Sequence, residues 1–220
     1  NFRLSHLKSS NTTFLDKDFE EKKKIFDDYD SYQKYLYKNG TILDQNKRKD
    51  LIKKNIEKVL KKKNLKIKVN EKLFDEVTNL IDHPYILECS FDKKFLSIPE
   101  EILILTMQSH QKYFPLFTKK DEITNEFIVI ANKKDDRGII KTGNERVVEA
   151  RLNDAEFFWN KDKSQNLVKK VSGLKSMNFF KGLGPYFDKV QRMRKLGGML
   201  SDELLISKEK VELSASVCKV

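Results

Sequence analysis

Apolar residues recur at helical spacing in the longest patterned stretch of the chain, residues 143–159. Four of them follow one another at steps of four, three and four, which places them on one face of a helix: Val148, Leu152, Ala155 and Trp159. We expect this stripe to be buried and the opposite, charged face to be solvated. Thr142 and Asn144 both suit an N-cap, so the helix is predicted to begin at one of them.

The same period predicts four helices earlier in the chain. Residues 31–38 form a short one, and a long basic helix runs from the N-cap Asp44 to about residue 63. A third helix follows the N-cap Asn70 and ends near residue 82, because the residue before a proline avoids helical conformation. The fourth covers residues 97–109, with Ser97 as its cap.

Strands are predicted where apolar residues alternate or run together: residues 41–43, 85–89, 112–117 and 126–131. Residues 127–131 are apolar without a break, which predicts a central strand. The polar stretch 160–165 is the best boundary, and helices are predicted after it at about 167–174, 187–200 and 208–220, with a break at 180–185. The fold class is therefore α+β, with a mixed domain 1–165 followed by an all-helical domain 166–220.

The composition is that of a globular chain: 39% of the 220 residues are hydrophobic and 35% are charged. No apolar run is long enough to span a membrane, and no signal peptide is visible. Cys89 and Cys218 lie far apart and have no metal-binding spacing, which fits a cytoplasmic protein. The chain begins with Asn1 and ends within a helical pattern, so we expect it to be a piece of a longer one.

The net charge of +11 indicates an anionic partner, with nucleic acid first among the candidates. Residues 44–70 hold 11 Lys/Arg against 3 Asp/Glu, so the charge is concentrated in the long basic helix. The alternative is a genome bias towards lysine, because only 7 of the 44 basic residues are arginine. Under that interpretation the lysines form an ordinary solvated face.

Eight basic residues are the candidates for RNA contact. Four are arginines, whose planar fork suits phosphate, in a chain that otherwise uses lysine; for Arg151 the alternative is an intrahelical pair with Asp154. Lys112 stands beside Tyr113 and Phe114, which could stack a base or could simply pack the two faces of a sheet. The full set is Lys53, Lys54, Lys61, Lys112, Arg146, Arg151, Arg192 and Arg194.

No catalytic, cofactor-binding or metal-binding set of residues is recognised. The chain has no phosphate-binding glycine loop, no nucleophile elbow and no paired histidines or cysteines. His110 lies at a predicted helix-to-strand turn, where a histidine is typically a structural hydrogen-bonding residue. His83 and His6 are isolated from it in the sequence.

Three segments together resemble one family, the β subunit of the bacterial two-subunit glycyl-tRNA synthetase. They are 107–117 (MQSHQKYFPLF), 143–158 (GNERVVEARLNDAEFF) and 183–192 (LGPYFDKVQR). The resemblance covers about residues 30–195 in order. This sequence departs from the family at Glu149-Ala150, where Arg-Pro is usual, at Asn153, where a small residue is usual, and at Pro185, where Thr is usual.

The resemblance implies an internal fragment of a longer β chain. Its first part would be similar to the editing-type domain of the phenylalanyl-tRNA synthetase β chain, and its last part to the start of an HD-type helical domain. No metal is expected there, since residues 168–220 contain no histidine. The family further implies an α subunit that forms glycyl-adenylate from glycine and ATP with magnesium, tRNA(Gly) as the RNA partner, and an α2β2 assembly without a membrane anchor.

Three functions follow as alternatives. The first is a non-catalytic module of glycine–tRNA ligase that faces tRNA and supports assembly. The second is an editing hydrolase that removes a wrong amino acid from tRNA, with His110 or a nearby aspartate positioning water. The third is a structural scaffold with no RNA contact of its own.

Overall fold

The computed structural model describes residues 3–17 and 20–220, and the chain forms two compact units, Asn1–Glu156 (unit 1) and Phe157–Val220 (unit 2). The division falls within the long helix α5 (Ile139–Lys163). The mixed α and β content predicted for the chain is confirmed. The domain boundary at residue 165 stays a prediction.

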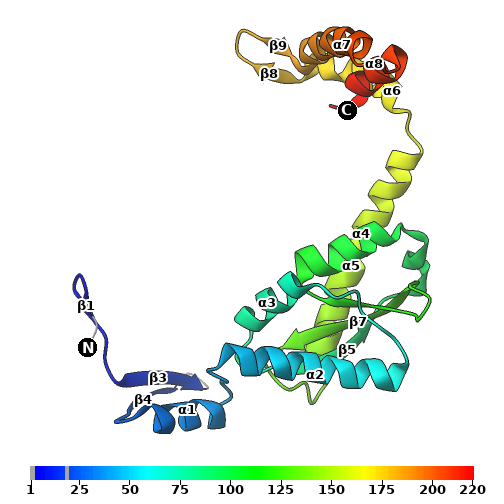
Figure 1. Cartoon of the computed structure of the whole chain (residues 1–220). Helices are drawn as coiled ribbons and strands as arrows, with labels where there is room; N and C mark the ends of the chain where they lie inside the picture. Colours follow the sequence, from blue (N-terminus) through cyan, green and yellow to red (C-terminus); the bar gives the residue numbers. More distant parts are fainter. Residues whose placement is uncertain (1–2, 18–19) are drawn as a thin grey trace. The chain divides into compact units, whose positions relative to one another are not determined.

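Unit 1 contains, in its described part, two small hairpins and one three-stranded antiparallel sheet with the strand order β5–β7–β6. Helices precede β5, separate β5 from β6 and follow β7, whereas a turn joins β6 to β7 (Figure 1). The elements before α5 are β1 (Arg3–Leu4), β2 (Leu7–Lys8), β3 (Thr12–Lys17), β4 (Glu20–Ile25), α1 (Tyr29–Lys38), α2 (Gln45–Lys63), α3 (Glu71–Leu80), β5 (Tyr85–Ser90), η1 (Lys93–Ser97), α4 (Glu100–Ile104), η2 (Leu105–His110), β6 (Phe114–Phe117) and β7 (Ile123–Ala131).

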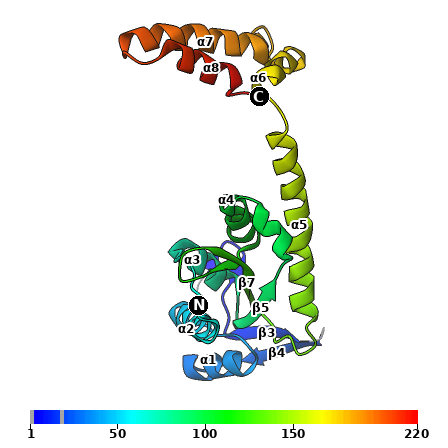
Figure 2. The ribbon, with the colours of Figure 1, turned by 90° about the vertical axis from the view of Figure 1, so that its right-hand side faces the viewer.

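The central strand β7 supplies both halves of the core, as its unbroken apolar run predicts. Phe127 and Val129 face one cluster of buried side chains, whereas Ile128 and Ile130 face another. This follows from the two-residue period of a strand. Figure 2 shows α2 and α3 on one side of the sheet and α5 on the other. The sheet is therefore buried between two layers of helices.

Helix α5 covers the sheet with the first half of its apolar stripe. Val148 and Leu152 are completely buried there, as predicted. Ala155 and Trp159 are only half-buried, so the prediction of a fully buried stripe is wrong for these two residues. They lie one and two turns beyond the part of the helix that packs on the sheet.

The start of α5 corrects a second prediction. The helix begins at Ile139, so Thr142 and Asn144 lie inside it and neither is its N-cap. The carboxylate of Asp135 accepts a hydrogen bond from the backbone N–H of Lys141 at 2.8 Å instead. A side chain from the preceding loop thus satisfies a donor of the first turn.

Two further predictions near residues 41–43 and 97 are wrong. Residues 41–43 form no strand, because their backbone groups bond to side chains and loops. Ser97 ends the 3₁₀ helix η1, and α4 begins at Glu100 after Pro99. The helix then continues as η2, which is a π-helix, so the stretch to residue 110 is helical but not uniformly α-helical.

Unit 2 contains α6 (Leu167–Lys170), η3 (Val171–Ser176), β8 (Asn178–Phe180), β9 (Gly184–Pro185), α7 (Tyr186–Glu203) and α8 (Lys208–Val217). Its hairpin β8–β9 corrects the prediction of an all-helical domain. The turn depends on Gly182 and Gly184, whose φ angles of +82° and +76° few other residues adopt. At Gly184 a Cβ would also clash with the side-chain carboxylate of Asp188.

Candidate nucleic-acid interface

Helix α2 carries the largest group of basic side chains in unit 1, and its ends are set as the sequence predicts. The carboxylate of Asp44 accepts hydrogen bonds from the backbone N–H groups of Asn46 and Lys47 at 2.9 and 3.1 Å. Asn64 ends the helix in the left-handed conformation. Ile52 and Ile56 are buried beneath α2 against the sheet, so the helix axis is held in place and its outer side faces solvent.

The lysines on the flanks of α2 are paired with carboxylates. Lys49 contacts Glu71 at 2.9 Å and Asp75 at 2.7 Å. Lys63 contacts Glu126 at 2.8 Å, and this hydrogen bond is the main reason that the pKa of Lys63 is raised. The flanking lysines therefore connect α2 to α3 and to the sheet.

Four other lysines form a separate row on the outer face of α2, here called the lysine stripe: Lys47, Lys54, Lys58 and Lys61. Steps of seven, four and three residues keep them on one side of the helix. All four are exposed, and among the described residues none has a carboxylate oxygen within 4.0 Å. At 1.5 Å per residue the stripe is about 21 Å long. It is a line of cations without close ion pairs, bordered by the exposed Asp50 and Glu57 of the same helix, and its length suits a nucleic-acid backbone.

The structure thus divides the predicted lysine contacts into two groups. Lys54 and Lys61 belong to the stripe, whereas Lys53 is paired with Glu71 at 2.8 Å and lies 5.2 Å from the centre of the Phe74 ring. Sequence reasoning did not single out Lys47 and Lys58, which lie in the same stripe. The helical spacing of these residues with Lys54 and Lys61 was the signal that could have identified them.

Lys112 lies in unit 1 and is also paired. Its ammonium group contacts Glu76 at 2.7 Å, and its backbone has the left-handed φ of 61°, two residues after the end of the π-helix. Tyr113 and Phe114 are buried on opposite faces of the sheet. The interpretation that these rings pack the sheet is therefore confirmed, and neither ring is available to stack on a base.

Replacing Lys112 with alanine is expected to raise the pKa of the Glu76 carboxyl towards its ordinary 4.5, because the hydrogen bond from Lys112 is the main cause of its lowering. A carboxyl group whose pKa is lowered by folding stabilises the folded state at pH values above its ordinary pKa. That contribution is lost as the pH falls through the lowered pKa. An NMR titration of the Glu76 side chain measures the shift. Lys72→Ala is the control, since Lys72 contributes less; an unchanged Glu76 titration in Lys112→Ala would contradict the pairing.

The two arginines of α5 differ in their surroundings. Arg146 is exposed, and the structure gives it no partner among the described residues. With the Gln111 amide turned so that its oxygen faces Arg151, Arg151 donates to it from Nε at 2.7 Å and from the terminal nitrogen at 3.2 Å. The proposed pair with Asp154 is absent from the described ion pairs, so the carboxylate explanation for Arg151 is wrong. Arg151 instead bonds to Gln111, which lies three residues before β6.

Arg192 and Arg194 lie on α7 of unit 2. Arg192 donates to the backbone oxygen of Leu183 from both terminal nitrogens at 3.4 Å, which ties α7 to the hairpin. Arg194 contacts Glu212 of α8 at 3.2 Å. Both side chains therefore already have structural partners within unit 2.

Groups suited to catalysis do not converge in the part of the chain that the structure describes. His110 is exposed, and its side chain makes no hydrogen bond there. Burial raises the pKa of the Cys89 thiol to about 12, so this cysteine remains protonated near neutral pH. Across residues 3–17 and 20–220, the histidine, cysteine and acidic side chains form no cluster suited to a metal. The described helices also include none that is long and apolar enough to cross a membrane.

Comparison with known proteins points to one family. Residues 1–220 match the family model described as "Glycyl-tRNA synthetase beta subunit". The glycine–tRNA ligase beta subunit of Thermodesulfovibrio yellowstonii is 36% identical over 220 residues, which is 99% of this chain and 32% of that protein. The corresponding subunits of Dictyoglomus turgidum and Syntrophomonas wolfei are 38% identical over 187 residues and 33% identical over 220 residues. These matches cover 84% and 99% of this chain but only 27% and 32% of the relatives.

Proposed function

Since the chain belongs to the glycyl-tRNA synthetase beta subunit family, we propose that it is part of a β subunit that attaches glycine to tRNA(Gly) with ATP, together with an α subunit. The chain spans 32% of the length of its relative from Thermodesulfovibrio yellowstonii, so this activity belongs to a larger protein. The family resemblance supports an α2β2 assembly in the cytoplasm, with ATP and magnesium bound by the α subunit.

Within that assembly, this part of the β subunit faces the tRNA and does not carry the aminoacylation chemistry. The lysine stripe is the observation that carries this proposal. Its four lysines lack the carboxylate partners that the flanking lysines Lys49 and Lys63 have. A lysine bias in the genome would add lysines to both sides of α2 alike. It does not account for carboxylates of other elements that pair with the flanking lysines while, among the described residues, none comes within 4.0 Å of the stripe.

The electrostatic consequence is specific. Each lysine that contacts an RNA phosphate releases a counterion, so binding weakens as salt is added. Lysines that are already paired with carboxylates contribute much less, since the cation is neutralised before RNA arrives. Within unit 1, the stripe is therefore expected to account for most of the salt dependence of tRNA binding.

The fold supports a finer proposal. Unit 1, with its mixed sheet covered by helices on both faces, corresponds to an editing-type domain similar to that of the phenylalanyl-tRNA synthetase β chain. Unit 2, with α7 packed against α8, corresponds to the start of an HD-type helical domain. We assign unit 1 no editing chemistry, since His110 lacks partners that would position a water molecule.

The test uses the full-length β subunit assembled with its α subunit and tRNA(Gly) transcribed with 4-thiouridine. After irradiation, cross-linked peptides are identified by mass spectrometry. We expect cross-links to α2 whose yield falls steeply between about 50 and 200 mM salt, as counterion release requires. Cross-links confined to other parts of the β subunit, with none on α2, would leave this segment as a structural scaffold and contradict the proposal.

A further inference from the structure

A hollow of about 420 Å³ lies between α1 and the start of α2. Tyr37, Leu43 and Leu51 supply much of its apolar lining, and Lys34, Asp44 and Lys47 are among its few charged groups. Its size falls in the range of small-ligand sites, about 300–1,000 Å³, and such sites combine apolar walls with a few polar groups. Neither the family assignment nor the lysine stripe explains why this hollow exists.

The wall of the hollow is fixed before any ligand arrives. Arg48 donates hydrogen bonds to the backbone oxygens of Ile42 and Leu43 and, through Nε, to that of Thr78 at 3.2 Å. The backbone N–H of Ile42 donates to the oxygen of Asp82 at 2.9 Å. These bonds explain why residues 41–43 form no strand: they are held as the wall of the hollow. A wall ordered in advance lowers the entropic cost of binding.

The chemistry of the lining suits an unpaired nucleotide. Tyr37 is 63% exposed and offers a ring on which a base can stack. Lys34 and Lys47 are exposed, and neither has a carboxylate oxygen within 4.0 Å among the described residues. Lys47 is also the first residue of the lysine stripe. An RNA backbone that follows the stripe therefore reaches the mouth of the hollow.

We propose that this hollow binds one unpaired nucleotide of the tRNA, with its base against Tyr37 and its phosphate between Lys34 and Lys47. The inference rests on the proposed RNA-facing function and adds a subsite to it. Oδ1 of Asp44 accepts hydrogen bonds from two backbone N–H groups. The other carboxylate oxygen of Asp44 has no hydrogen bond within the described residues. That oxygen accepts a hydrogen bond from the exocyclic amino group of adenine, cytosine or guanine. Uracil has no such amino group.

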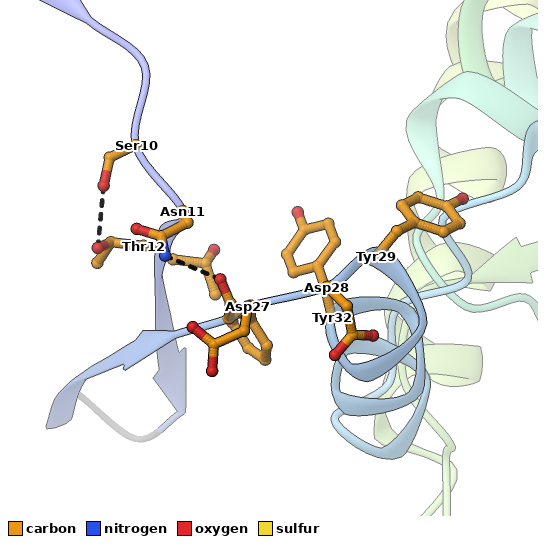
Figure 3. Close-up of a pocket in the computed structure, with 9 residues that line it drawn as sticks. Ser10, Asn11, Thr12, Asp27, Asp28, Tyr29 and Tyr32 are labelled. Atoms are coloured by element: carbon orange, nitrogen blue, oxygen red, sulfur yellow. Dashed lines mark hydrogen bonds between the residues drawn. The ribbon is translucent and has the colours of Figure 1, made fainter. Parts of the chain in front are cut away.

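A second hollow in unit 1 provides a matched contrast. It has a similar volume, about 410 Å³, and its lining residues include two tyrosines, Tyr32 and the 61% exposed Tyr29 (Figure 3). Its charged lining residues are Asp27 and Asp28, and no lysine lines it. Two carboxylates repel a phosphate. This acidic hollow is therefore not expected to bind RNA, and Tyr29 serves as the control for Tyr37.

The experiment uses the full-length protein with its partner subunit and tRNA(Gly), first in the wild type. Dimethyl sulfate modifies the ring nitrogens of unpaired adenine and cytosine, so a base held in the hollow is protected. We expect one unpaired position to be protected by the wild type and to become reactive with Tyr37→Ala. We also expect Tyr37→Ala to lower the tRNA affinity about five- to hundredfold with an unchanged salt slope. Tyr37→Phe and Tyr29→Ala are expected to remain within about twofold of wild type.

The outcomes separate the subsite from the function on which it rests. Binding without salt dependence and without cross-links to α2 refutes the RNA-facing function and the subsite with it. Salt-dependent binding in which Tyr37→Ala changes neither affinity nor protection refutes the subsite alone. A Tyr37→Ala loss that appears in sedimentation as failed subunit assembly assigns the hollow to a protein side chain and also refutes it. Circular dichroism checks that the variants fold. If Tyr37→Ala is misfolded, Leu43→Glu is tested in its place. Loss of the wild-type protection in Leu43→Glu supports the subsite, and unchanged protection refutes it.

Discussion

Replacing Lys47, Lys54, Lys58 and Lys61 together with glutamine is expected to lower the affinity of the assembled protein for tRNA(Gly) by about 10² to 10³ at physiological salt. Each lysine that neutralises a phosphate contributes about 0.7 to 0.9 to the slope of log affinity against log salt. The slope should therefore fall by about three to four. Filter binding or fluorescence anisotropy over a series of salt concentrations measures both quantities.

The matched control removes the same charge elsewhere. Lys72, Lys93, Lys120 and Lys133 are exposed and scattered over unit 1, and replacing them with glutamine lowers the net charge by the same four units. If contact with the stripe matters, this control leaves the slope nearly unchanged. Equal losses in the two variants would mean that total charge steers the RNA without a defined interface, and the stripe would then have no special role.

Replacing Phe127 with alanine is expected to destabilise unit 1 by about 3–5 kcal/mol. Phe127 is completely buried in the central strand, and its ring stacks near those of Phe91 and Tyr113 at centroid distances of 6.3 and 5.4 Å. Truncation removes both contacts and leaves a cavity in a close-packed core. Few substitutions in the chain should lower the free energy of unfolding more, because β7 carries core residues on both of its faces.

Hydrogen exchange followed by mass spectrometry measures this loss of stability in the full-length protein. This method is chosen because a protein of several domains does not unfold in a single transition, whereas exchange reports on each region separately. The slowest amides of β5 and β7 should exchange faster by the factor that corresponds to the lost free energy. Phe157→Ala is the control, since Phe157 is 60% exposed and should cost less than about 0.5 kcal/mol. Unchanged protection of β7 in Phe127→Ala would contradict the assigned core.

Much of the local structure could be predicted from the sequence because it depends on neighbouring residues. Asp44 and Asn70 accept hydrogen bonds from backbone groups two or three residues further along, so their capping roles can be recognised in the chain itself. The unbroken apolar run 127–131 predicts a strand buried on both faces for the same reason. The family motifs were likewise local, and the whole-chain family match agrees with them.

The errors have different physical causes. Residues 41–43 have the composition of a strand, but Arg48 and the oxygen of Asp82 bind their backbone groups. Ser97 has the spacing of a capping box, but it ends the preceding 3₁₀ helix. In unit 2 the hairpin β8–β9 is only a few residues long, too short to produce a recognisable alternation of polar and apolar residues.

For the candidate interface, the sequence by itself determined that α2 is a basic helix with a buried face and that the chain belongs with glycyl-tRNA synthetase β subunits. Only the tertiary structure decided which lysines of α2 form ion pairs with carboxylates of other elements. The carboxylates of Glu71, Asp75 and Glu126 come from other elements and reach the flanks of α2 when the chain folds. The net charge follows from the sequence by adding up its residues. Whether a given lysine can bind an RNA phosphate depends on whether folding brings a carboxylate within contact distance of it.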